Sequence, residues 1–142
     1  ATDHAPHTSE EKASTDYREA PSGLPLVQDA LLSLLELCRD GSLAIEDIVQ
    51  RTAHNVADRF GVIDRGYLRE GYWADLVIVD TERPTPVTRD RVLSQCGWSP
   101  FEGRTFRSSI IATLVNGQPV YRDGRIIECE AAARLEFRPQ RG

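Results

Sequence analysis

The spacing of apolar residues changes near Gly61, and this change constrains the fold more than any other feature of the sequence. Before Gly61, apolar side chains recur at the three- to four-residue spacing of amphipathic helices, whereas after it short β-branched runs are separated by turn residues. The sequence therefore predicts two unlike parts, a helical one at residues 1–62 and a β-rich one at residues 63–142. Pattern alone indicates no more than a mixed α and β protein.

Three helical segments are predicted in the first part. Apolar residues at helical spacing predict a helix over residues 25–39, and Gly41 follows it where a left-handed residue commonly ends a helix. A second helical stretch is expected to begin near Ser42, and a short third helix covers residues 55–60 and ends at Gly61. Each helix should present one apolar face to a core.

The second part carries strand and turn signals. Residues 74–80 form a short β-branched run, typical of a strand buried on both faces. Asn116-Gly117, between the apolar residues 110–115 and residues 119–121, is a dipeptide that strongly favours a tight hairpin. Asp123-Gly124 predicts a second tight turn into a last short strand. We therefore expect an antiparallel meander at the C-terminal end.

The stretch between these strands, residues 81–107, is rich in proline, glycine and charge and predicts an irregular loop. Within it, residues 95–103 show no periodicity, and we expect Trp98, Pro100 and Phe101 to anchor them. A role for Trp98 as a platform for substrate stays open as the alternative.

Composition and charge exclude several classes of function. The net charge is −5 and the arginines are scattered, with Lys12 the only lysine, so no basic patch suggests a nucleic acid partner. The longest apolar run, at residues 110–115, is too short to cross a bilayer, and we expect no membrane association. Cys38, Cys96 and Cys129 are widely spaced and form no metal-ligand pattern, which is typical of reduced thiols in a cytoplasmic protein.

One dense cluster of titratable residues lies at the start of the chain, where Asp3, His4 and His7 surround a proline. A strand end that runs into a loop is where barrel enzymes place catalytic groups, and a carboxylate there can bind a metal and accept a proton from its bound water. A nearby histidine can donate to a substrate anion. On these residues alone, a merely solvated chain end stays open. We expect His54 to have a packing role and Asp29 to lie on the solvent-facing side of its helix.

Several motifs taken together resemble dihydroorotases of the amidohydrolase superfamily. The sequence TDHAPH at residues 2–7 resembles the motif of the last barrel strand in that family. Residues 21–25 and 96–103 are more similar to one bacterial branch of dihydroorotases than to hydantoinases or allantoinases. Further similar segments are EEK at 10–12, DRGYL at 64–68, GYWADLV at 71–77 and VNG at 115–117.

The resemblance implies a fold and a set of roles. The fold would be an α/β unit plus a β unit: the last strand and following helices of a TIM barrel in residues 1–62, leading into a small accessory β-sandwich in residues 63–142. Asp3 would be a metal ligand and the general base, His7 would bind the substrate carboxylate, and backbone groups near Gly23 would touch the substrate ring. The implied reaction is the reversible, zinc-dependent cyclisation of N-carbamoyl-L-aspartate to dihydroorotate in pyrimidine biosynthesis.

The chain departs from the family's pattern because most of the metal site is absent. It contains no His-x-His pair, and a complete barrel needs about 200 residues or more. It also contains no methionine, which a fragment, a processed product or removal of an initiator before Ala1 would explain. We therefore expect a portion of a longer protein, with one or two Zn²⁺ ions held mainly by residues outside this chain and no turnover by the chain alone. The missing barrel segment would be its necessary partner, and a homo-oligomer is compatible with the sequence.

Two other functions stay open. A related cyclic amidohydrolase would act on dihydropyrimidines, hydantoins or allantoin, and His7 discriminates because only a substrate with a ring carboxylate needs a group to bind it. A non-catalytic dihydroorotase-like subunit that scaffolds a partner enzyme is the alternative of a different class. The presence of both Asp3 and His7 counts against that alternative.

Overall fold

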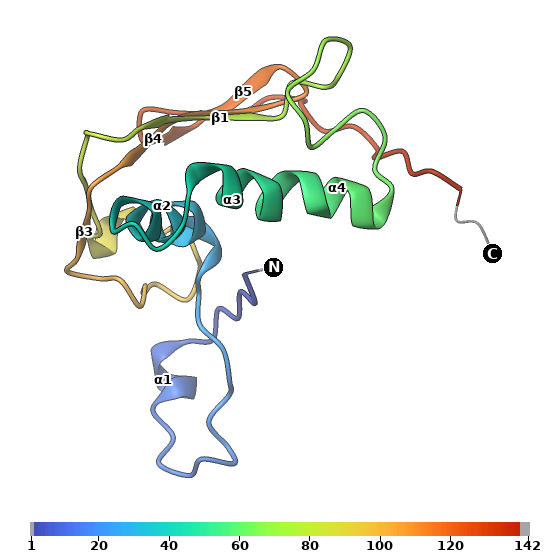
Figure 1. The fold of residues 1–142 in the computed structure, drawn as a ribbon. Helices are drawn as coiled ribbons and strands as arrows, with labels where there is room; N and C mark the ends of the chain where they lie inside the picture. The colour runs from blue at the N-terminus through green and yellow to red at the C-terminus, as the bar shows by residue number, and fades with distance from the viewer. Residues whose placement is uncertain (1, 140–142) are drawn as a thin grey trace.

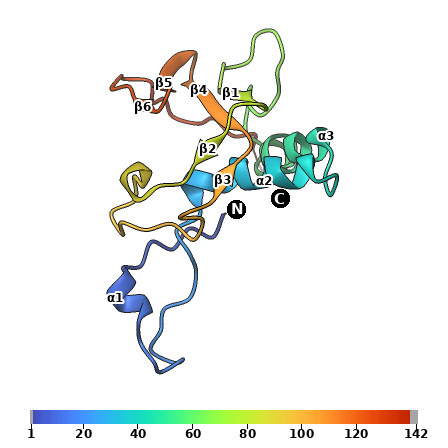
Figure 2. The same cartoon turned by 90° about the vertical axis from the view of Figure 1, so that its left-hand side faces the viewer.

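The computed structural model describes residues 2–139, and in it the helices of residues 30–60 lie under one face of an antiparallel sheet (Figure 1). The segment around the short helix α1 extends away from both layers (Figure 2). The helices are α1 (Ser9–Lys12), α2 (Ala30–Arg39), α3 (Ile45–Val49) and α4 (Asn55–Phe60). The strands are β1 (Leu76–Asp80), β2 (Thr85–Pro86), β3 (Thr105–Phe106), β4 (Ser109–Val115), β5 (Gln118–Arg122) and β6 (Arg125–Ile126). The predicted change from helical to β structure is confirmed.

Helix α2 begins later than the predicted residue 25 and ends where predicted. A 3₁₀ turn at Val27–Asp29 precedes it. The backbone N–H of Val27 donates to Nδ1 of His4 (3.3 Å). This N–H is therefore bonded to the N-terminal segment and not to a carbonyl of a helical turn. At the other end Gly41, with φ 76°, takes the left-handed conformation that ends a helix.

The two further helices form one continuous helical run rather than two separate helices. α3 begins later than predicted because the Asp47 carboxylate accepts the backbone N–H of Ala44 (3.1 Å) and so caps the first turn. A π-helical turn at Gln50–His54 joins α3 to α4. Gly61, with φ 65°, ends the run as predicted. None of the described helices is long and apolar enough to cross a bilayer.

The predicted hairpins are confirmed. β4 and β5 pair across Asn116-Gly117, whose φ values of 51° and 81° are of the kind that a type I′ turn requires. Asp123-Gly124, with φ values of 46° and 85°, makes the second tight turn into β6. β1 pairs with the other side of β4, which makes the strand order β1-β4-β5-β6.

Strand β1 is less buried than its sequence predicts. Val77 and Ile78 are 48% and 50% exposed, although successive side chains of a strand point to opposite faces of the sheet. Within residues 2–139, β1 is an edge strand that pairs with β4 alone. The prediction of burial on both faces is therefore wrong for the described part of the chain. Burial depends on what covers the sheet, which the residues of the strand do not encode.

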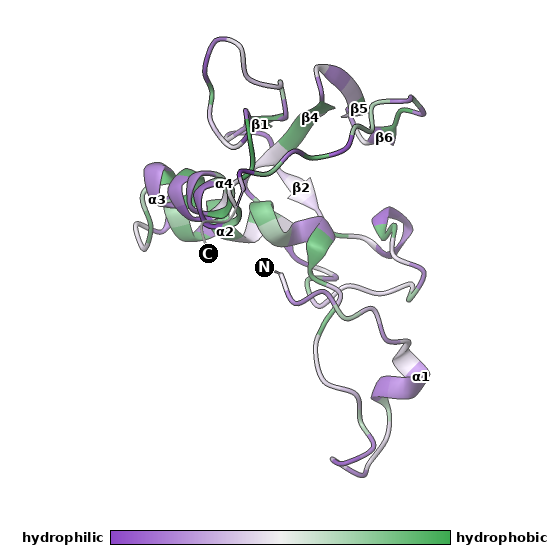
Figure 3. Cartoon of the chain, turned by 90° about the vertical axis from the view of Figure 1, so that its right-hand side faces the viewer, coloured by the Kyte–Doolittle hydropathy of each residue, from purple (hydrophilic) through white to green (hydrophobic). Residues whose placement is uncertain are grey.

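The core joins residues from both sides of residue 62. Its buried members are Leu32, Leu35, Ile48, Val87 and Phe106. Apolar parts of α2 and β4 are green in Figure 3. The prediction of an irregular loop at residues 81–107 is wrong in part, because β2 and β3 pair there, with Thr85 opposite Phe106. Residues 95–103 are a loop, as predicted.

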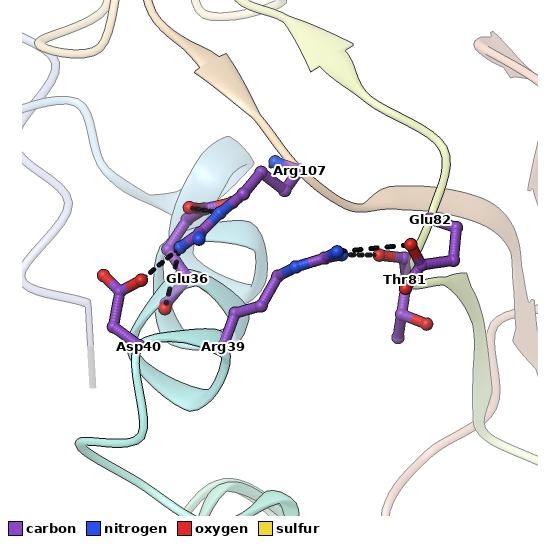
Figure 4. A network of polar contacts seen from close by, with 6 residues as sticks. All are labelled: Glu36, Arg39, Asp40, Thr81, Glu82 and Arg107. Carbon is purple, nitrogen blue, oxygen red and sulfur yellow. Dashed lines mark hydrogen bonds and ion pairs between the residues drawn. The ribbon is translucent and has the colours of Figure 1, made fainter.

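Two arginines connect α2 to the segments beside it (Figure 4). The backbone N–H and the guanidinium of Arg107 both donate to the Glu36 carboxylate (2.6 and 2.7 Å), and the guanidinium also reaches Asp40 (2.5 Å). Arg39 donates to the Glu82 carboxylate (3.2 Å). Because solvent reaches all of these side chains, the pairs are screened and contribute little to stability. They show which segments lie beside α2.

Candidate functional site

The N-terminal motif lies beside the segment that precedes α2. His4 forms an isolated parallel bridge with Leu24, and the Ala5 N–H donates to the Leu24 carbonyl (2.9 Å). The predicted strand end is thus present as a single bridge, followed by a turn in which the His7 N–H donates to the Ala5 carbonyl (2.9 Å). Asp3, which directly precedes the bridge residue His4, has a left-handed backbone (φ 50°) and an exposed side chain.

Gly23 lies against this motif, and only glycine fits there. Its φ is 88°, and a Cβ at this position would lie 2.5 Å from Cβ of Ala5 and 3.8 Å from the carbonyl oxygen of Asp3. Lys12 holds the same turn, because its ammonium group donates to the carbonyls of Pro21 (2.6 Å) and Gly23 (3.2 Å). The fold therefore brings Gly23 and the backbone of Asp3 together.

His7 is half-buried and faces a carboxylate. Its Nδ1 lies 3.7 Å from Oε2 of Glu11. Glu11 forms a capping box with Thr8: the Thr8 N–H donates to the Glu11 carboxylate (2.7 Å), and the Glu11 N–H donates to the Thr8 hydroxyl (3.2 Å). The hydrogen bond from the Thr8 backbone lowers the pKa of Glu11, and nearby His7 lowers it further by a smaller amount. A fixed carboxylate is therefore held beside the imidazole.

The other two histidines make structural contacts. Nδ1 of His4 accepts a hydrogen bond from the backbone of Val27, which connects the motif to the 3₁₀ turn that precedes α2. His54 stacks on Tyr67 with ring centroids 4.1 Å apart and planes 8° from parallel. The packing role predicted for His54 is confirmed.

The sequence fails to predict the burial of Asp29 but does predict the anchoring role of Trp98. Asp29 is 2% exposed, and its carboxylate accepts a hydrogen bond from the Ser99 hydroxyl (3.0 Å), so the prediction of a solvent-facing position is wrong. Nothing in the sequence signals this burial, since an acid in the first turn of a helix is ordinarily solvated. Trp98 donates from Nε1 to the His7 carbonyl (2.8 Å), which confirms its predicted anchoring role.

Two hollows flank α2. One, of about 360 Å³, is lined by residues that include His4 and Trp98. The other, of about 650 Å³, lies between α2 and the sheet. Neither is lined by Asp3, His7 or Gly23.

Asp3 does not make a metal site by itself. Among residues 2–139, no group of three or more His, Cys, Asp or Glu side chains is placed to hold a metal ion. Protein zinc sites use about three or four protein ligands. The described residues can supply a carboxylate ligand, and the location of the other ligands outside this chain stays a prediction.

The fold matches solved structures of hydantoinases and dihydropyrimidinases. The chain superposes on D-hydantoinase from Thermus sp. with a TM-score of 0.80 at 23% identity, covering 92% of this chain and 30% of that one. For dihydropyrimidinase from Brevibacillus agri the TM-score is 0.78 at 26% identity, covering 88% and 28% of the two chains. The described fold is therefore shared with part of these proteins.

The family follows from the sequence comparisons. The model of the Amidohydrolase family matches residues 16–121, and the chain belongs to this family. Dihydroorotase from Clostridium acetobutylicum is 40% identical over 124 residues, which are 87% of this chain and 29% of that protein. Dihydroorotase from Halobacterium salinarum is 44% identical over 121 residues, 85% of this chain and 28% of that protein.

These comparisons confirm the resemblance to dihydroorotases, and they also limit what it shows. The chain spans less than a third of the length of these relatives. The match to the family model begins at residue 16 and does not include Asp3 or His7. The roles of these two residues are therefore proposals.

Proposed function

We propose that the full-length protein is a dihydroorotase, which reversibly closes N-carbamoyl-L-aspartate to dihydroorotate in cytoplasmic pyrimidine biosynthesis. The observation that carries this proposal is the close approach of Gly23 to Ala5 and to the backbone of Asp3, beside the His4–Leu24 bridge and within the short motif that also holds His7. The similarity to dihydroorotases at 40% and 44% identity supports the choice of substrate.

Each of the three residues has a distinct part in this proposal. In the ring-opening direction, a water oxygen adds to the ring amide carbon and Asp3 accepts the water's proton. The carbon–nitrogen bond then breaks, and Asp3 delivers the proton to the leaving nitrogen. His7 binds the substrate carboxylate through a charge-assisted hydrogen bond from its imidazole N–H. Gly23 lets its turn approach residues 3–5, so that its backbone groups reach the ring.

The cofactor in this proposal is zinc, which would polarise the amide carbonyl when bound. Asp3 would be one ligand, and the others, for one or two ions, would come from outside residues 1–142. We also propose that residues 1–62 complete a barrel, that residues 63–142 form part of an accessory β-sandwich, and that the chain alone does not turn over substrate.

The test is hydrolysis of dihydroorotate by the full-length protein supplied with zinc. Asp3→Asn keeps the side-chain shape but removes the base, and it should lower kcat by about 100-fold or more. His7→Asn removes the imidazole donor to the substrate carboxylate and should raise KM by about tenfold or more. His54→Asn is the matched control, because it replaces a histidine outside the site, and both constants should stay within about twofold of the wild type. Full activity of Asp3→Asn would contradict the proposal.

A hydantoinase or dihydropyrimidinase is the second candidate. The observation that favours it is the fold match to dihydropyrimidinase from Brevibacillus agri, at a TM-score of 0.78. Turnover of hydantoin or dihydrouracil in place of dihydroorotate, with no effect of His7→Asn, would select this function. A full-length protein that binds no zinc and turns over none of these substrates would favour the non-catalytic scaffold.

A further inference from the structure

Trp98 connects the loop of residues 95–103 to the N-terminal motif. Its indole N–H donates to the backbone carbonyl of His7 at 2.8 Å, across 91 residues of sequence. The side chain is half-buried, and a partly buried indole N–H needs an acceptor. The bond therefore fixes one segment of the chain against another that is remote in sequence.

The loop that carries Trp98 is itself held from two sides. Next to Trp98, the Ser99 hydroxyl donates to the buried carboxylate of Asp29 (3.0 Å) and accepts the Phe101 N–H (3.2 Å). Phe101 packs edge-on against Phe106 of the core, with ring centroids 5.3 Å apart. The indole is thus carried by the start of α2 and by the core.

His7 is held through both of its backbone polar groups. Its N–H donates to the Ala5 carbonyl (2.9 Å), and its carbonyl accepts the indole N–H of Trp98. When the peptide groups on both sides of a residue are fixed, the direction of its Cα–Cβ bond is fixed as well. The root of the imidazole is therefore placed before any ligand arrives, and Glu11, 3.7 Å from Nδ1, faces the ring itself. Such preorganisation lowers the cost of binding.

We propose that Trp98 is a positioning residue for His7, whose imidazole it aims at the substrate carboxylate. This inference rests on the proposed dihydroorotase function. Trp98 touches no reacting atom, and its effect passes through His7 alone. Loss of the indole N–H should therefore change KM for the carboxylate-bearing substrate and leave kcat nearly unchanged.

A double-mutant cycle in the full-length, zinc-supplied enzyme tests this. Trp98→Phe keeps an aromatic ring and removes the N–H donor, and it should raise KM for dihydroorotate about threefold to tenfold, the effect of one hydrogen bond. In the His7→Asn background the same change should have no further effect on KM, because the group that it positions is gone. Trp73→Phe, at a half-exposed tryptophan outside the motif and its supporting loop, is the matched control and should leave KM and kcat unchanged.

Two kinetic outcomes would overturn the proposal: an unchanged KM in Trp98→Phe, or an increase of equal size with and without His7. NMR of the His7 imidazole supplies a readout that does not need turnover. The His7 resonances should shift in Trp98→Phe while those of His54 stay in place, and unshifted His7 resonances would also overturn it. If the wild type does not hydrolyse dihydroorotate, the proposed function fails, and the NMR comparison then decides whether Trp98 positions His7.

Discussion

Replacement of Gly23 by alanine should disrupt the candidate site through two separable effects. Gly23 has φ 88°, a left-handed conformation that costs an L-residue about 1–2 kcal/mol. The added Cβ would lie 2.5 Å from Cβ of Ala5, whereas non-bonded carbons rest at about 3.5–4.0 Å. The turn must therefore move by about 1 Å, and such overpacking costs about 1–3 kcal/mol. Together these terms predict a loss of about 2–5 kcal/mol in the free energy of unfolding.

Gly103→Ala is the matched control for the conformational share of this loss. Gly103 has φ 82°, but a Cβ there would meet no described atom within 4 Å. It should therefore lose only about 1–2 kcal/mol. In the double variant Gly23→Ala/Ala5→Gly, the colliding methyl group is gone, and the steric share of the loss should be recovered.

Urea unfolding of the full-length protein, followed by tryptophan fluorescence, measures these differences. Hydrolysis of dihydroorotate measures their effect on the site. Because a displacement of about 1 Å can cost 10²-fold in rate, Gly23→Ala should lose far more activity than Gly103→Ala. Equal losses of stability in the two single variants, or no recovery in the double variant, would refute the reasoning.

Three further predictions concern stability and are measured on the same full-length protein. Leu32→Ala should lower the free energy of unfolding by about 2–5 kcal/mol because Leu32 is 3% exposed in the core, whereas the more exposed Leu37→Ala on the same helix should cost far less in urea unfolding. Asp29→Ala should cost about 1–3 kcal/mol, since it leaves a buried hydroxyl without its acceptor, and an unchanged urea midpoint would argue against that contact. The hydrogen bond from the Tyr67 hydroxyl to Asp58 raises the pKa of Tyr67, and a group with a raised pKa contributes stability that is lost as the pH rises through the folded value. The thermal midpoint of the wild type should thus exceed that of Tyr67→Phe near about pH 8, and the gap should close well above about pH 10; a gap independent of pH would speak against the bond.

Turns and helix ends could be predicted from the sequence because they depend on adjacent residues. Asn116-Gly117 adopts the φ values that its hairpin turn requires, and Gly61 ends the helical run because it lacks a Cβ. Strands β2 and β3 could not be predicted, since each spans two residues, too few for any period. Their pairing depends on a contact between Thr85 and Phe106, which are far apart in sequence.

In the candidate site, too, features that depend on adjacent residues could be predicted, whereas features that depend on remote residues could not. Asp3 and His7 stand within one short motif, so their clustering could be seen in the sequence. The burial of Asp29 depends on Ser99, 70 residues later, and the fixing of His7 depends on Trp98, 91 residues later. Helical and strand periods describe neighbours along the chain, and they carry no information on such pairs.

Helix α2 links the candidate site to the β-rich part of the chain. At its N-terminal end Asp29 holds the loop that carries Trp98, while Leu32 and Leu35 belong to the same core cluster as Phe106. At its C-terminal end the polar network of Figure 4 contacts the segment before β4. Helix α2 thus contacts the loop that carries Trp98, the core cluster and the segment before β4. A shift of the sheet against α2 would therefore reach the loop that holds the His7 backbone. The β-rich part therefore helps to set the geometry of the site, although Asp3, His7 and Gly23 all lie in the helical part.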